Sequence, residues 1–339
     1  MSDGTGLEAV DERDEGAGQV RELAVPSAAP LVSLAGLGEQ ARAYVDEAVS
    51  ANTRRAYRAD WRAFDAWCSV RGRASLPAAP TTLAFYLTDQ AELLKTSTLQ
   101  RRLAAIAQAH RLAGHPAPTE DATVRMVWRG IRRAKGTLQV GKAALLTNDV
   151  RAIVVALPLS TIGTRDRALL LLGFAGAFRR SELVALDVAD VEVTHEGLAV
   201  LIRRSKTDQE GEGQKIGIPR GSRPGTCPVR AYTAWLELAG IVDGPIFRPV
   251  NRHGQIQPGR LTDRSVARVV QRAAEAAGLD PANYAGHSLR AGLATAAAMA
   301  GAEERDIMRQ TRHKSVAVAR RYIRDGSLFR SNVAAAVGL

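Results

Sequence analysis

Hydrophobic and polar residues alternate with a helical period through the first third of the chain. Four apolar side chains recur every three or four residues along one stretch: Tyr57, Trp61, Phe64 and Cys68. This spacing predicts a helix with one apolar face, and Arg55 and Arg62 belong to its basic face. We interpret the aromatic side chains as core and not as a surface for stacking bases, because a stripe at this spacing is typical of a buried helix face.

Two more segments before residue 134 show the same period. One helix after Thr96 is predicted to bury Leu99, Leu103 and Ile106, and a later one to bury Val124, Val127 and Ile131. Their opposite faces are predicted to be exposed and carry Gln100, Arg101 and Arg102 in the first helix and Arg125, Arg129, Arg132 and Arg133 in the second. Three basic helix faces exceed what solubility requires. We therefore expect residues 37–134 to form an all-helical domain that binds DNA.

The pattern changes after residue 134. Residues 135–146 have no periodicity and are predicted to be a linker, and a very apolar helix is predicted from Thr164. Apolar residues then alternate with polar ones at Leu198, Val200 and Ile202 and again at Ile216 and Ile218. This alternation predicts a β-hairpin, with Lys206 at its polar, glycine-rich tip. Residues 147–325 are thus expected to form a mixed α+β domain, in which Arg264 opens a further helix.

The two ends of the chain differ from the rest. Residues 1–36 are rich in Gly, Ala, Pro and acidic residues and are predicted to be a disordered acidic tail. Near the other end, Asp325, Gly326 and Ser327 form a turn signal, and apolar residues then recur every four positions. Residues 326–339 are therefore predicted to form a short C-terminal helix, which either folds back on its own domain or docks elsewhere.

The net charge of the chain indicates what kind of partner it binds. The 339 residues carry a formal net charge of +11, and residues 1–25 hold seven acidic and two basic residues, so the remainder holds 44 basic and 28 acidic ones. A body this basic indicates a polyanionic partner, and nucleic acid is the partner we expect. No apolar run is long enough to span a bilayer and no secretory signal is visible, so we expect a cytoplasmic protein without a membrane partner. The two cysteines lack metal-binding spacing, and no metal cluster is evident.

The candidate chemistry gathers between residues 286 and 324. His287 and Arg290 stand three apart at a predicted helix start, with Ser288 as the expected N-cap, where backbone N–H groups favour an anion. A second helix, capped by Ser315, would carry Tyr322 and place His313 just before it. Cationic side chains, histidines and a tyrosine around a helix start describe a phosphate site with its own nucleophile.

With two upstream residues these side chains form an ordered set: Arg179, Lys206, His287, Arg290, His313 and Tyr322. The set resembles the tyrosine recombinases, also called phage integrases, and within that family the Cre-like enzymes most. The resemblance runs from about residue 50 to the C-terminus. It implies a SAM-like helical core-binding domain and a mixed α+β catalytic domain that form a C-shaped clamp around DNA.

The resemblance also implies roles. Tyr322 would be the nucleophile, and Arg179, Arg290 and His313 would hold the scissile phosphate. His287 would assist proton transfer, Lys206 would be the general acid, and Glu182 would orient its neighbours. Contacts with DNA would come from Arg55 and Arg62 to the backbone and from Gln100, Arg101, Arg102 and Arg264 to the bases.

Three positions depart from the pattern of the family. Cre-like enzymes have tryptophan at the position of His313, although most of the wider family has histidine. Arg312 replaces the usual glycine, and Phe178 replaces a small aliphatic residue. The departures leave the predicted chemistry intact.

The expected function is therefore a site-specific DNA recombinase that works through a 3′-phosphotyrosine without metal, ATP or another cofactor. It would act as a homo-tetramer on two double-stranded sites with inverted repeats, with the C-terminal helix docked in trans, and would associate with the nucleoid. Two alternatives stay open at this point: relaxation of supercoils as in a type IB topoisomerase, and a DNA-binding regulator with the same fold. A metal-dependent integrase is disfavoured, because no acidic triad is evident.

Overall fold

The structure, a computed structural model, describes residues 34–47, 49–137, 141–203, 213–327 and 337. The chain separates into two compact units, Met1–Gln139 and Val140–Leu339. Each unit has a hydrophobic core of its own. No helix in the described part of the chain is both long enough and apolar enough to cross a membrane.

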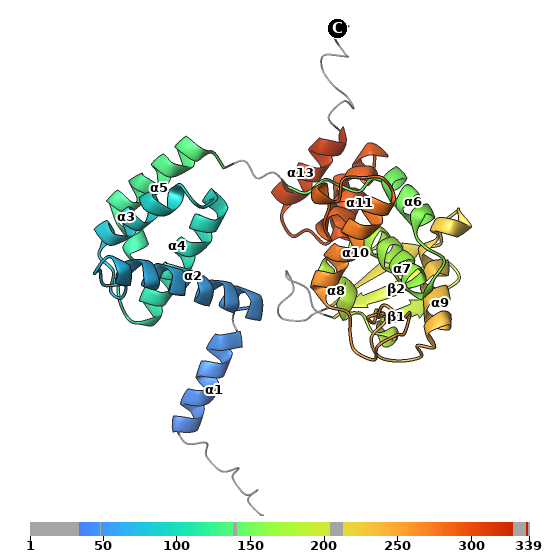
Figure 1. Ribbon diagram of the computed structural model, residues 1–339, viewed down its shortest axis with the longest axis horizontal. Helices are drawn as coiled ribbons and strands as arrows, with labels where there is room; N and C mark the ends of the chain where they lie inside the picture. The colour runs from blue at the N-terminus through green and yellow to red at the C-terminus, as the bar shows by residue number, and fades with distance from the viewer. Residues whose placement is uncertain (1–33, 48, 138–140, 204–212, 328–336, 338–339) are drawn as a thin grey trace, which may run out of the picture. The chain divides into compact units, whose positions relative to one another are not determined.

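The described residues of the first unit form helices and no strands (Figure 1). The helices are α1 (Leu34–Glu47), α2 (Ala51–Val70), α3 (Pro80–Ala91), α4 (Thr96–Leu112), the 3-10 turn η1 (Pro118–Glu120) and α5 (Ala122–Lys135). Phe64 and Cys68 of α2 are fully buried and Trp61 packs against the same core, so the predicted apolar face is confirmed. The four arginines of α5 are all exposed, as its spacing predicted.

The prediction that Arg102 of α4 is exposed is wrong, whereas its neighbour Arg101 is partly exposed. Arg101 is half exposed and donates two hydrogen bonds, of 2.7 and 3.0 Å, to the buried Asp60 of α2. Arg102 is not exposed: its Nη1 donates to the Tyr86 hydroxyl at 2.5 Å and to Gln90 Oε1 at 2.9 Å. Both acceptors belong to α3, which covers a side chain that helical spacing alone placed on the polar face.

The second unit joins helices to a three-stranded antiparallel sheet. Its helices are α6 (Thr147–Ala156), α7 (Thr161–Ala175), α8 (Arg180–Ala185), η2 (Val188–Asp190), η3 (Pro224–Thr226), α9 (Pro228–Ala239), α10 (Asp263–Ala276), η4 (Pro281–Asn283), α11 (His287–Met299), α12 (Glu304–Thr311) and α13 (Val316–Ser327). The strands are β1 (Val191–Val193), β2 (Gly197–Ile202) and β3 (Gln214–Pro219), in the order β1-β2-β3. Leu198 pairs with Ile218 and Val200 with Ile216, all on the buried face, which confirms the predicted hairpin.

Helix α7 lies at the centre of the second unit. Four consecutive leucines, residues 169–172, point to all sides of a helix, so α7 can be stable only when other elements surround it. It packs against α6, α8, α9, α10 and α11, and these leucines are buried. The helix begins at Thr161 and not at Thr164, because the Ser160 hydroxyl caps it by accepting from the Gly163 N–H at 3.3 Å.

Helices α11 and α13, orange to red in Figure 1, pack against each other within the second unit. The predicted N-cap of α11 is wrong: Gly286 occupies that position. Ser288 lies inside the first turn, and its hydroxyl accepts from the Ala285 N–H at 3.0 Å. The predicted turn at 325–327 is also wrong, since α13 continues to Ser327.

The last residues of the predicted linker belong to the second unit. Leu145 is fully buried, and its N–H donates to the Ser288 carbonyl oxygen at 3.0 Å. A Cβ atom on Gly292 would stand only 1.8 Å from the Leu145 carbonyl oxygen, so this close passage past α11 requires glycine. The segment just before α6 therefore helps to hold the helix that carries His287 and Arg290.

Candidate active site

Two residues of the predicted catalytic set lie at the start of α11. His287 is its first residue and Arg290 follows one turn later, so both side chains leave the helix on one side. The Arg290 guanidinium is almost fully buried, and Nη1 donates to the carbonyl oxygen of Ala177 at 2.8 Å. Its Nη2 has no hydrogen-bond partner among the described residues, although it is buried. A buried N–H donor without an acceptor destabilises the protein. A bound anion would supply the missing acceptor, so this donor is suited to an anion site.

The other predicted arginine, Arg179, directly precedes α8. Its Nη1 pairs with the Glu182 carboxylate, and its backbone N–H donates to the second carboxylate oxygen at 2.9 Å. Burial alone would raise the pKa of Glu182, but the charges of Arg312 and Arg179 outweigh burial and hold that pKa below its usual range. Glu182 is thus an ionised partner that binds both the side chain and the backbone N–H of Arg179. Its orienting role in catalysis stays a prediction.

Hydrogen bonds in the connection from α12 to α13 determine which ring nitrogen of neutral His313 carries the hydrogen. The Thr311 hydroxyl donates its only proton to the Ile307 carbonyl oxygen at 2.7 Å. Its contact of 2.8 Å with His313 Nδ1 therefore requires that Nδ1 carry the ring hydrogen. The neutral ring then has its lone pair at Nε2.

Tyr322 stands two turns into α13 and is half-buried. Its hydroxyl oxygen lies 2.7 Å from Nε2 of His287. Its ring stacks on that of His313, with centroids 5.7 Å apart and planes inclined by 16°. Arg320 and Glu304 join α13 to α12 through an ion pair of 2.8 Å. Tyr322 therefore lies beside His287 and His313 of the same chain.

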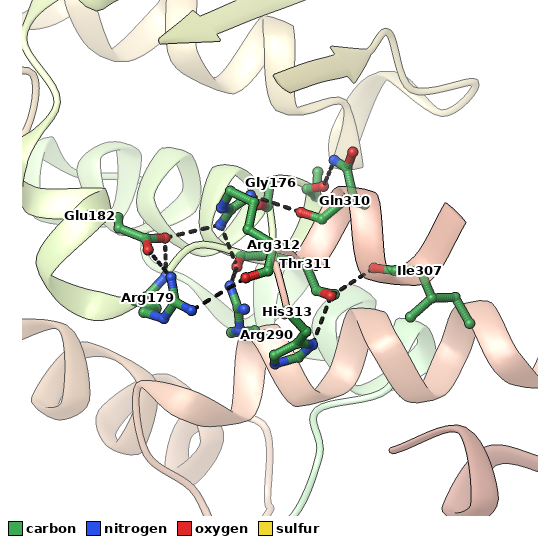
Figure 2. A network of polar contacts seen from close by, with 11 residues as sticks. Gly176, Arg179, Glu182, Arg290, Ile307, Gln310, Thr311, Arg312 and His313 are labelled. Atoms are coloured by element: carbon green, nitrogen blue, oxygen red, sulfur yellow. Dashed lines mark hydrogen bonds and ion pairs between the residues drawn. The ribbon is translucent and has the colours of Figure 1, made fainter. Parts of the chain in front are cut away.

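Positive charge dominates this cluster. The guanidiniums of Arg179 and Arg312 both bind the Glu182 carboxylate, and the charges of all three groups act on the buried guanidinium of Arg290 (Figure 2). Burial and the charges of Arg179 and Arg312 lower the pKa of Arg290 to about 9, so it stays charged at neutral pH. The cluster favours an anionic ligand, because the positive charges outnumber the negative one.

The same environment keeps both histidines neutral. Burial, followed by the charges of Arg290 and Arg179, lowers the pKa of His313 to about 4. Burial and the same two arginines also lower the pKa of His287. In the neutral tautomer that carries its hydrogen on Nδ1, Nε2 of His287 can accept a proton from the tyrosine hydroxyl 2.7 Å away.

The structure brings together five of the six residues in the predicted catalytic set. The sixth, Lys206, lies outside the described residues. Among the residues that are described, no three His, Cys, Asp or Glu side chains are grouped in a way that could hold a metal ion.

The predicted DNA contacts occupy both units. Arg55, Arg62 and Gln100 of the first unit and Arg264 of the second are exposed. Arg55 and Arg62 line one pocket of α2 together with Arg54 and Arg58. These exposed side chains are available to a polyanion, whereas Arg102 is engaged with α3.

Arg312 is the member of the network that sequence reasoning missed. Its guanidinium is buried and bonds to Glu182 and to the loop before Arg179. The sequence showed only that Arg312 replaces the glycine that is usual in the family. It did not indicate that the Arg312 side chain is buried.

The geometry agrees with what comparison with known proteins shows. Residues 144–327 match the model described as the Phage integrase family, and residues 43–115 match the Phage integrase, N-terminal SAM-like domain. The first match contains the whole described cluster around Tyr322. The chain belongs to the phage integrase family of tyrosine site-specific recombinases. This confirms the family that the ordered residue set predicted.

Individual relatives refine the placement of this tyrosine recombinase. It is 41% identical over 300 residues to an integrase/recombinase XerD homolog of Selenomonas ruminantium, covering 87% of this chain and 88% of the relative. It is 26% identical over 293 residues to recombinase Cre of Escherichia phage P1, covering 78% and 81%. The predicted likeness to Cre is therefore distant. A Tn1549 transposon integrase in complex with transposon right end DNA shares the fold, with a TM-score of 0.59, 14% identity and coverage of 88% and 98%.

Proposed function

We propose that this recombinase cuts and rejoins duplex DNA at a specific site through a covalent bond between Tyr322 and a 3′-phosphate. The observation that carries the proposal is the 2.7 Å contact between the Tyr322 hydroxyl and neutral His287 beside the buried guanidiniums. A free phenol has a pKa of about 10, so a tyrosine nucleophile needs a local base or a cationic field at neutral pH. Tyr322 has both within its own chain.

The proposed step exchanges one phosphodiester for another. The Tyr322 oxygen attacks phosphorus while the bond to the deoxyribose 5′-oxygen breaks, and the tyrosine proton passes to Nε2 of His287. Negative charge that develops on the non-bridging oxygens is stabilised by the forked guanidiniums of Arg179 and Arg290. The number of phosphate ester bonds does not change, so the reverse step can rejoin a strand without ATP, and no step requires a metal ion.

The departing 5′-oxygen needs a proton. We assign this role to Lys206, because an ammonium in the segment between β2 and β3 can act as a general acid. This assignment stays a prediction from the sequence and the family.

The proposed substrate is double-stranded DNA with inverted repeats, bound by four copies of the chain on two sites. Support comes from the net charge of +11 and from the exposed arginines of α2 and α5. Base contacts are proposed for Gln100, Arg264 and the half-exposed Arg101. Arg102 is left out, because its guanidinium is bound to Tyr86 and Gln90 of α3. Such a protein would act in the cytoplasm, where the nucleoid DNA is.

Two other functions use the same fold. A type IB topoisomerase would relax supercoils through similar chemistry, and a regulator would bind DNA without cleaving it. The relative with 41% identity is named a recombinase, and the described catalytic residues are all present, which favours recombination over both.

A plasmid assay separates the three. The binding site is first selected from random duplexes, and two copies are placed in one supercoiled plasmid, with a plasmid lacking the site as control. We expect recombination between the two copies and no relaxation of the control. Relaxation of both plasmids without recombination would identify a topoisomerase, and binding without any strand cleavage would identify a regulator.

A further inference from the structure

Arg312 adopts a backbone conformation that is unusual for arginine. It caps the C-terminus of α12 with φ 55° and ψ 44°, in the left-handed region where glycine or asparagine is common. Its side chain is 2% exposed, although arginine is seldom buried. Both the backbone strain and the burial of a charge need compensation from contacts of the guanidinium.

The guanidinium finds four acceptors on three segments. Nη1 donates to the carbonyl oxygens of Gly176 at 2.9 Å and Gln310 at 2.7 Å. Nη2 donates to the Ala177 carbonyl oxygen at 2.8 Å and to Glu182 Oε2 at 3.0 Å. The group also lies over Phe178, with Cζ 5.4 Å from the ring centroid. Phe178 and Arg312, which both depart from the family pattern, thus contact each other.

Two of these acceptors are shared with the arginines that are proposed to bind the phosphate. The Ala177 carbonyl oxygen also accepts from Arg290 Nη1 at 2.8 Å. The Glu182 carboxylate also binds the side chain and the backbone N–H of Arg179. In addition, Arg179 Nη2 approaches the Arg312 carbonyl oxygen at 3.5 Å. One buried side chain therefore touches the anchors of both arginines.

We propose that Arg312 is a positioning residue, which holds Ala177 and Glu182 in place so that Arg290 and Arg179 face the scissile phosphate. This inference rests on the proposed cleavage of DNA by Tyr322. It predicts that Arg312 matters more for the transition state than for DNA binding, because the forks of Arg290 and Arg179 must align with developing charge. A purely structural cap would affect folding stability and leave the cleavage step unchanged in folded protein.

Arg312→Gly isolates the guanidinium, because glycine accepts the left-handed backbone without strain. Cleavage is measured in a single turnover on a nicked duplex that traps the covalent adduct, and DNA affinity is measured separately. We expect a loss of cleavage rate of about 100-fold, comparable to removal of one transition-state donor, with DNA affinity little changed. Added methylguanidinium should restore part of the rate, and tetramethylammonium at equal ionic strength should not.

Two further variants complete the test. Arg165→Ala removes another buried arginine of the same unit, whose guanidinium binds Asp166 and the Arg248 carbonyl oxygen. This variant should cleave like the original protein at a temperature where it is folded. Arg312→Lys keeps the charge but loses the fork, and it should cleave slowly.

Three outcomes would overturn the inference: Arg312→Gly cleaving at the original rate, a loss in Arg165→Ala equal to that in Arg312→Gly, or full activity of Arg312→Lys. Absence of an adduct in the original protein would instead overturn the proposed function itself.

Discussion

His313 is held in a form that does not suit a phosphate. Its ring is neutral because burial and the charges of Arg290 and Arg179 lower its pKa to about 4, and its hydrogen lies on Nδ1 towards Thr311. The lone pair at Nε2 would repel a phosphate oxygen. A bound phosphodiester, however, offsets the charge of the arginines and favours the protonated ring.

We therefore expect DNA binding to raise the pKa of His313 above 4. Between the free and bound values the complex holds more protons than the free protein, so affinity should increase as pH falls through this range. Nuclear magnetic resonance titration of the imidazole in free and DNA-bound Tyr322→Phe protein measures both values. His313→Gln should lose this part of the pH dependence. If the pKa stays at about 4 in the complex, Nε2 does not donate to the phosphate.

At the scale of elements, α10 offers a direct test of base recognition. Val266, Val269 and Val270 bury one face of the helix in the core of the second unit. Arg264, its second residue, is exposed at the opposite face. A helix fixed by its apolar face presents such an arginine in a defined direction, as reading of a guanine edge in the major groove requires.

Arg264→Ala should cost about 1–3 kcal/mol of binding free energy at one base position of the site and relax the preference there. Site selection from random duplexes, followed by affinity measurement, gives the preference at each position. Arg268→Ala is the matched control, since Arg268 is exposed one turn later on the same helix. The Arg268→Ala substitution should lower the affinity for all DNA sequences equally or leave it unchanged. An unchanged base preference in Arg264→Ala would remove this residue from the recognition surface.

Elements with a strong period were predictable from the sequence. Apolar and polar residues alternate on both sides of the predicted hairpin, because a strand that is buried on one face has every second side chain in the core. This alternation predicted β2 and β3. Strand β1 was missed, since Val191–Val193 is too short to show a period and depends on pairing with β2. The candidate catalytic residues were identified for another reason: their order along the chain resembles that of the tyrosine recombinases.

Contacts between distant segments were not predictable in the same way. Arg102 lies on a polar helix face by spacing, yet the hydroxyl of Tyr86 on α3 reaches it. The guanidinium of Arg312 binds the carbonyl oxygens of Gly176 and Ala177, which carry no signal in the sequence because every residue has one. The tertiary fold decides such interactions, so the network around Glu182 required the structure.

At the scale of the whole molecule, the proposed tetramer on two DNA sites depends on a contact between copies of the chain. Helix α13 includes residues 325–327, so a C-terminal docking segment can begin only after Ser327. Residues 328–336 lie outside the described residues, and their apolar spacing stays a prediction from the sequence. A contact that passes from each copy to the next forms a closed ring if its rotation closes, as a tetramer on two DNA sites requires.

Deletion of residues 328–339 should leave binding to a single site nearly intact and remove complexes with two sites, together with recombination. The reason is that the deletion removes the proposed contact in trans and spares the nucleophile helix. Gel shift and light scattering on DNA with one or two sites measure both. Full-length Tyr322→Phe should still assemble and serves as the control. If the truncated protein joins two sites at normal concentration, the tail packs on its own domain.

The bond between protein and DNA tests the central claim most directly. A nicked duplex that carries the selected site traps the covalent complex, which is digested with protease and nuclease and sequenced by mass spectrometry. We predict that Tyr322 carries the nucleotide through its hydroxyl oxygen and a 3′-phosphate, and that Tyr322→Phe binds the same duplex without forming the adduct. An adduct on another residue, a link to a 5′-phosphate, or an adduct that persists in Tyr322→Phe would contradict the account.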